Sequence, residues 1–199
     1  MKTDLAKRVQ PPPDSDEWLG FAGATDTELE ELEKRLGLIL PPSYRDFLLT
    51  TNGWRRTDAF IGRIRPADEV NWLRVEHESW VEMYSDHGSA LPDSEFYNYT
   101  KHSELHHRAE HVASLIQISD VDDGVYLLNP NAVTPDGEWE AWFFASWVPG
   151  ARRCPSFAHL MVDDYRSFAE LEKVRGLGRA IPKLRMPAAT VPRVHAERI

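Results

Sequence analysis

Four histidines between residues 101 and 111 are the side chains of this sequence with the clearest metal-binding spacing. His102 and His106 are four residues apart, and so are His107 and His111. If the segment is helical, each pair lies on one face and can share a zinc ion. The two pairs lie about 140° apart on such a helix, so they do not form one four-ligand site. We therefore expect a polar or partner-binding face without a metal, and His102 and His106 are the metal candidates if one binds.

A second group of chemical interest is the run of carboxylates Asp120, Asp122 and Asp123 before Gly124. The pattern is reminiscent of a calcium-binding loop. However, an EF-hand needs a third ligand position before its glycine and a glutamate at the twelfth place. Here the glycine comes one residue early and the twelfth place is Asn131. The pattern favours a tight hairpin turn with exposed carboxylates, and a role in partner binding stays open.

Two further groups have side chains of the types found in catalytic sites. Asp163 and Asp164 are adjacent in an expected helix, where neighbouring side chains point about 100° apart, so they do not suit an acid–base pair. Cys154 follows Arg152 and Arg153, which would favour a thiolate, but no motif of a cysteine enzyme surrounds it. Glycine-rich nucleotide-binding motifs and G-x-S-x-G are also absent from the sequence. We expect no catalytic residue and no cofactor.

The charge of the 199-residue chain is unevenly distributed. The net charge is −9, yet residues 173–199 carry seven basic groups and one acidic group, so residues 1–172 carry −15. An acidic body repels nucleic acid and anionic membranes and attracts a basic protein, although acidity can also serve solubility alone. The sequence has one cysteine, no signal-peptide pattern and no long apolar run. These features predict a cytoplasmic protein that does not enter a membrane.

The positions of turn residues and apolar residues predict the elements that carry these groups. A capping box at Thr25 and Glu28 predicts a helix up to Gly37, and Pro41–Pro42 predicts a second helix that ends at Asn52–Gly53. A short strand is expected over 60–65 and a helix from Pro66 to about Tyr84.

The second half of the chain favours strands. They are expected over 112–118, 124–128 and 139–147, the last covered on both sides, before a final helix from Pro155–Ser156. The buried face of that helix would include Phe157, Tyr165 and Leu171. The fold class is α+β, with a mostly antiparallel sheet of about 4–6 strands packed with helices. The expected organisation is a flexible lead-in (1–15), one domain (16–174) and a basic, proline-containing tail (175–199).

Several of these residues, taken in order, resemble the SUKH superfamily of fungal cell-wall-synthesis regulators and bacterial immunity proteins. In the first half the matching residues are Leu29, Leu32, Glu33, Leu36, Gly37, Leu40, Pro41, Tyr44, Phe47, Leu48, Asn52 and Gly53. In the second half they are Ile118, Ser119, Asp123, Gly124, Tyr126, Leu127, Leu128, Trp142, Pro155, Ser156, Phe157, Leu160 and Met161. The resemblance covers roughly residues 25–172 and implies a compact α+β fold without a shared catalytic residue set.

The resemblance also implies a function through protein binding. Bacterial members are immunity proteins that neutralise a cognate toxin, and fungal members are regulatory interaction modules. We therefore expect an immunity protein that binds a toxin, which the acidic body suggests is basic. The alternative is a cytosolic regulatory adaptor for endogenous proteins that uses the basic tail. The expected contact residues are Trp54, Asp120, Asp122, Asp123, Asp136 and Glu138. Trp147 is the other tryptophan considered as an exposed anchor, and Trp54 is preferred because it follows a turn.

Overall fold

The computed structural model describes most of the chain. The described residues are 20–55, 60–85, 92–99, 107–145, 147–148 and 150–178. The chain divides into two units between Asp164 and Tyr165, and each is considered by itself. His102 and His106 lie outside the described residues, so the metal prediction for this pair stays a prediction.

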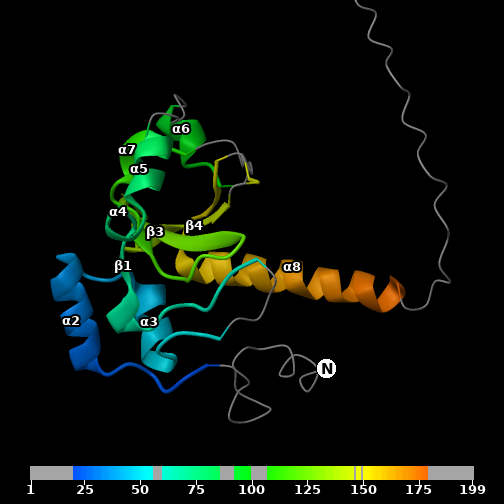
Figure 1. Ribbon diagram of the computed structural model, residues 1–199, viewed down its shortest axis with the longest axis horizontal. Coiled ribbons are helices and arrows are strands. Elements are labelled where there is room, and N and C mark those ends of the chain that lie inside the picture. The colour runs from blue at the N-terminus through cyan, green and yellow to red at the C-terminus, as the bar shows by residue number, and fades with distance from the viewer. Residues whose placement is uncertain are drawn as a thin grey trace, which may run out of the picture. The chain divides into compact units, whose positions relative to one another are not determined.

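A five-stranded antiparallel sheet in the order β1-β2-β3-β4-β5 forms the centre of the first unit (Figure 1). Its strands are β1 (Asn71–Trp72), β2 (Ile116–Gln117), β3 (Gly124–Val133), β4 (Trp139–Ala145) and β5 (Arg152–Cys154). Each strand pairs with its neighbour in the chain, with short connections from β2 to β5 and a long connection from β1 to β2 that contains the helices α4 to α7. The expected α+β class with an antiparallel sheet is confirmed.

The long pair β3 and β4 supplies both hydrophobic cores. Successive side chains of a strand point to opposite faces, so Ala141 and Phe143 enter one core and Trp142 and Phe144 the other. Every residue of β4 is buried. The expectation that this strand is covered on both sides is therefore confirmed.

The first core lies between the sheet and the helices α2 (Asp26–Leu36), α3 (Pro42–Thr50) and the start of α8 (Phe157–Gly178). The capping box predicted for α2 is present: the Thr25 hydroxyl accepts from the Glu28 N–H, and the Glu28 carboxylate accepts from the Thr25 N–H. Gly37 ends this helix with a positive φ of 71°, as a C-terminal glycine is expected to do.

The opposite face of the sheet is covered by four short helices (Figure 1). They are α4 (Leu73–Glu76), α5 (Glu78–Ser85), α6 (Asp93–Phe96) and α7 (Ala109–Val112), and the 3₁₀ turn η1 (Ala67–Glu69) precedes them in the chain. Leu73, Val112 and Leu115 contribute to the second core with the buried side chains of β3 and β4.

Three expectations about the elements are corrected by the structure. The single helix expected from Pro66 to Tyr84 is interrupted, because Asn71–Trp72 pairs with β2. The strand expected over 60–65 is reduced to isolated bridges at Ile61 and Ile64. In α8, Phe157 is buried as expected, but Tyr165 is 67% exposed and Leu171 is 47% exposed. No described helix has the length and apolar character needed to cross a membrane.

Candidate protein-binding surface

Asp122 and Asp123 lie on the turn that leads from β2 into β3, and both are exposed. The turn is closed by the Asp122 N–H, which donates to the Gly124 carbonyl at 3.1 Å. Gly124 pairs with Ala145, where β4 ends. The two carboxylates and the residues after β4 therefore emerge at the same end of the sheet, which we call the 122–147 end.

Three aromatic side chains cluster at the 122–147 end. The ring centroid of Trp147 lies 5.8 Å from that of Phe60 and 5.6 Å from that of Phe143, with the rings tilted. The Phe60 carbonyl accepts from the Gly124 N–H at 2.8 Å and so ties its segment to β3. Phe143 is buried beneath the cluster, whereas Trp147 is 58% exposed and Phe60 41% exposed.

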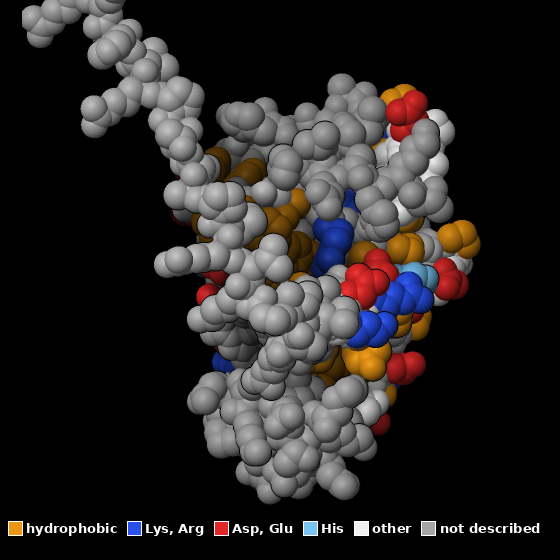
Figure 2. Space-filling model, turned by 90° about the vertical axis from the view of Figure 1, so that its right-hand side faces the viewer, with side chains coloured by type: hydrophobic (Ala, Val, Ile, Leu, Met, Phe, Trp, Pro, Cys, Tyr) orange, Lys and Arg blue, Asp and Glu red, His pale blue; other side chains and the backbone are white. Residues whose placement is uncertain are grey.

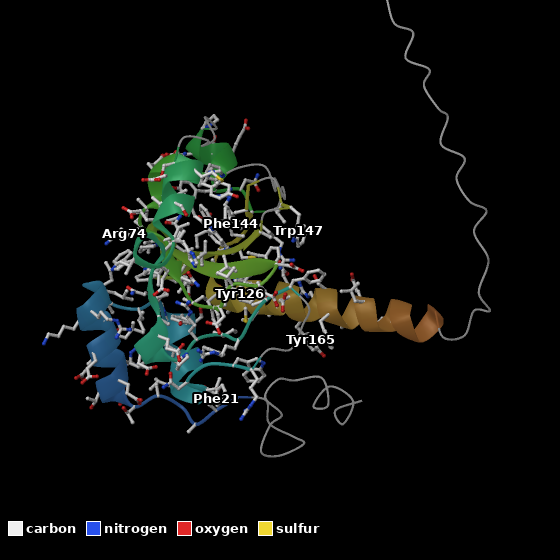
Figure 3. The ribbon with its side chains drawn as sticks, viewed as in Figure 1. Phe21, Arg74, Tyr126, Phe144, Trp147 and Tyr165 are labelled. Atoms are coloured by element: carbon white, nitrogen blue, oxygen red, sulfur yellow. The ribbon has the colours of Figure 1, made fainter. Side chains whose placement is uncertain are left out.

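The position of Trp147 relative to the sheet can be followed in Figure 3. Figure 3 shows Phe144 and Tyr126 on opposite faces of the sheet and Trp147 at its end. Figure 2 faces that side of the molecule, where described hydrophobic side chains gather beside acidic and basic ones. An exposed tryptophan on a buried aromatic base, next to carboxylates, is the composition of a protein-binding hot spot with a charged rim.

Gly124 has a steric role in this cluster. Its φ is not positive, so the hairpin does not need a glycine for its backbone conformation. A Cβ at this position would lie 2.9 Å from Cε2 of Phe143, which is closer than carbon atoms pack. The glycine therefore lets the Phe143 ring lie across β3 and support Trp147.

Asp120 is engaged within the protein. Its Oδ2 accepts from Arg63 Nε at 2.9 Å and its Oδ1 from Arg65 Nε at 3.1 Å. Its own N–H donates to the Arg63 carbonyl at 2.9 Å. The carboxylate is largely neutralised by two guanidinium groups, and its main contribution is to join the loop before η1 to the sheet.

Glu138 is also occupied by an internal contact. Its two carboxylate oxygens accept from the Ser43 N–H at 2.8 Å and from the Ser43 hydroxyl at 2.7 Å. These bonds satisfy a donor in the first turn of α3, where Pro42 provides none and a negative charge is favourable. Glu138 thus acts as a cap for α3 that comes from a distant part of the chain.

Asp136 is exposed on the loop that joins β3 to β4, where it accepts from the Thr134 hydroxyl at 2.6 Å. This loop lies at the opposite end of β3 from Asp122 and Asp123. Ten residues of strand separate the two ends, or about 30 Å. A typical interface covers about 800 Å² on each partner, so a partner centred on one end does not need the other.

Trp54 lies in a different place from the one expected for an exposed anchor. It forms isolated antiparallel bridges with Gly20 and Ile64 and packs, half-buried, against the first core. Its backbone accepts from and donates to Ile64. Of the two tryptophans considered from the sequence, Trp147 is the more exposed, because the turn after β4 projects it from the sheet.

The second core contains a buried charged cluster that the sequence analysis did not find. Glu140 is fully buried, and its carboxylate accepts from Arg153 Nη1 at 2.6 Å, Trp142 Nε1 at 2.7 Å and Asn129 Nδ2 at 2.8 Å. Burial and the neighbouring Glu140 carboxylate raise the Tyr99 pKa. The charge is thus paired and hydrogen-bonded, as a buried charge must be.

The Glu140 cluster fixes α6 against the sheet. Arg153 Nη2 donates to the Phe96 carbonyl, and the guanidinium carbon lies 3.7 Å from the centroid of the Phe96 ring. A sequence signal for this cluster exists in hindsight, since Glu140 is the one charged residue of β4, a buried and otherwise apolar strand. The arrangement is structural, with all the carboxylate's contacts directed inward.

The described histidines of the 101–111 stretch do not share a metal site. His107 Nε2 faces the Tyr84 carbonyl at 3.2 Å, and His111 Nδ1 faces Asn129 Nδ2 at 2.9 Å. Because the Asn129 amide donates here, the Nδ1 atom of His111 is unprotonated. Burial lowers the His111 pKa. Within the part of the chain that the structure describes, no group of three His, Cys, Asp or Glu side chains could hold a metal ion.

The cysteine and the aspartate pair also lack the geometry of catalysis. Cys154 is buried, and burial with the nearby Asp163 carboxylate raises its thiol pKa to about 12. A thiol in this state is a poor nucleophile at neutral pH. Asp164 lies 3.9 Å from Arg152 Nη2, while Asp163 Oδ2 faces the Cys154 sulfur at 3.8 Å, so the two carboxylates point to different partners.

Exposed aromatic and acidic side chains at one end of a sheet are typical of a surface that binds other proteins. The profile of the SMI1 / KNR4 family (SUKH-1) matches residues 23–171, and the chain therefore belongs to this family. Membership supports a protein-interaction or immunity-type role in general, in a family whose members are generally not catalytic. No match was found among curated proteins.

Proposed function

We propose that this protein is an immunity-type inhibitor that binds a basic toxin domain through the 122–147 end of its sheet. The observation that carries the proposal is the exposed Trp147, supported by Phe60 and Phe143 and flanked by the exposed Asp122 and Asp123. Opposite charge would accelerate association, and the desolvated tryptophan would slow release.

The charges outside this end agree with a basic partner. Residues 1–172 carry a net −15, so the body as a whole attracts a cationic domain before contact is made. Asp120 and Glu138 hold the fold together internally, and Trp54 packs on the core. The proposed contact set is therefore narrowed to Asp122, Asp123 and Trp147, with Asp136 as a separate site at the other end of β3.

Affinity capture from the cells that produce the protein tests the proposal. The tagged full chain is used at about 50 mM and about 200 mM salt, because screening changes strongly over this range. We expect one basic protein at near-equal stoichiometry, more abundant at low salt, whose toxicity on expression is relieved by co-expression of this chain. A captured partner whose toxicity is unaffected by this chain would refute the inhibitor function.

The regulatory adaptor is distinguished from the immunity protein by the basic tail, which adds +6 to residues 173–199. Deleting residues 179–199 removes five basic groups and one acidic group, or +4 of this charge. An adaptor that uses the charge loses its partner on this deletion. The inhibitor proposed here retains it, because its contact residues all belong to the domain. Quantitative capture with the shortened chain measures this difference directly.

A further inference from the structure

We infer that the 122–147 end recognises an arginine side chain of the partner, stacked on Trp147 and paired with Asp123. This inference rests on the proposed function, since it specifies the chemistry by which a basic partner is bound. It concerns a single contact that can be tested with a small molecule.

The first argument is the geometry of the aromatic side chains. Trp147 contacts Phe60 and Phe143 through tilted rings, and these contacts leave 58% of the residue exposed. An indole is the best aromatic surface for a cation, because its faces are the most electron-rich. A guanidinium group is planar and weakly hydrated, so it stacks on such a face more readily than an ammonium group does.

The second argument is the position of the carboxylates. Gly124 and Ala145 are paired neighbours, so the residues just outside this pair, Asp123 on one strand and the turn to Trp147 on the other, leave the sheet side by side. A cation on the indole therefore has acidic partners within the same small area. An arginine can stack with its face and donate hydrogen bonds with its edge at once.

The third argument is that this protein already uses the same contact internally. Arg152 lies over the Phe143 ring at 4.9 Å while its Nη2 is 3.9 Å from Asp164. Arg55 lies over Phe21 at 4.3 Å and Arg74 over Trp72 at 4.2 Å. Among the described residues, no arginine occupies Trp147 itself. Its exposed face thus remains open to an arginine from another molecule.

The test is an NMR titration of the full-length protein with N-acetyl-arginine amide, which carries the proposed group alone. The indole N–H signal of Trp147 is assigned by its loss in Trp147→Phe. The neutral analogue N-acetyl-citrulline amide has nearly the same shape and serves as the matched ligand. We expect both compounds to shift the Trp147 signal, and the affinity read from this shift to be about fivefold higher for the arginine compound than for the citrulline compound. Fivefold is the factor that corresponds to one exposed cation–π contact.

Two variants locate the effect. Asp123→Asn should weaken the arginine response of Trp147 at least twofold, whereas Glu31→Gln on the exposed face of α2 should leave it unchanged. An equal response to arginine and citrulline, or none at Trp147, would overturn the inference. Either result is independent of whether cells contain a toxin partner, so failure of this contact and failure of the inhibitor function are distinguishable.

Discussion

The buried pair of Glu140 and Arg153 predicts a large and strongly non-additive loss of stability on mutation. The two side chains lie 2.6 Å apart with almost no exposure to solvent. Arg153→Met leaves the Glu140 carboxylate buried without its cation. Glu140→Leu leaves the guanidinium uncompensated and removes the acceptor of Trp142 and Asn129.

The expected magnitudes follow from the contacts. Breaking one partner of a buried ion pair costs about 3–5 kcal/mol, and each polar group left unsatisfied adds about 1–3 kcal/mol. Glu140→Leu should therefore be the more damaging single change. The double variant, Glu140→Leu with Arg153→Met, removes both charges and should cost at least about 2 kcal/mol less than the sum of the single changes.

Urea unfolding of the wild type, both single variants and the double variant measures this cycle. Limited proteolysis adds a local readout, because Arg153 also holds the Phe96 carbonyl in α6. Arg153→Met should make the segment around α6 cleavable before the rest of the domain. Single changes that sum to the double within about 0.5 kcal/mol would refute the view that the two charges stabilise each other.

Three further predictions concern single residues. Burial lowers the His111 pKa below its ordinary 6.5, so the folded state binds a proton less readily than the unfolded state. The free energy of unfolding should therefore keep its full value above pH 6.5 and decrease as the pH falls below 6.5. Urea unfolding at several pH values should show a shallower decrease for His111→Gln than for the wild type. Cys154, with its thiol pKa raised to about 12, should react with iodoacetamide at pH 8 only after unfolding, as mass spectrometry can determine; rapid labelling of the folded protein would contradict this. Glu138→Ala should lower the free energy of unfolding by about 1–2 kcal/mol through loss of the α3 cap, without weakening partner binding.

The parts of the fold that were predictable from sequence are those with local signals. The helix α2 carries its capping box and its terminal glycine within a dozen residues, and α3 begins at a proline. The two-sided burial of β4 also followed from the apolar side chains that alternate onto both of its faces. In each case, the information needed lies within a single element.

The parts that were not predictable depend on contacts between distant residues. The segment 66–84 has helical apolar spacing, but pairing of Asn71–Trp72 with β2 interrupts it. The role of Glu138 depends on Ser43, 95 residues away in the chain. The Glu140 cluster likewise combines side chains from separate strands and loops, with no spacing that a sequence motif could reveal.

The exposure of Trp54 and Trp147 was likewise not predictable from sequence, because it depends on contacts between distant residues. Trp54 follows a turn, which favours exposure, yet its bridges to Gly20 and Ile64 hold it against the core. Trp147 belongs to an apolar run, which favours burial, yet β4 ends at Ala145 and leaves it in a turn. Exposure here is decided by where the sheet ends, and that depends on pairing between strands.

The most direct test of the proposed binding surface is comparative capture of the partner by two matched variants. The first combines Trp147→Ala, Asp122→Lys and Asp123→Lys at the 122–147 end. The second combines Val133→Ala at the other end of β3 with Glu30→Lys and Glu31→Lys on α2, and so makes the same change in net charge at exposed positions. We predict that the second variant retains the partner captured by the wild type and that the first loses it by at least about tenfold, equivalent to about 1.4 kcal/mol. Equal capture by both variants would contradict binding through this surface.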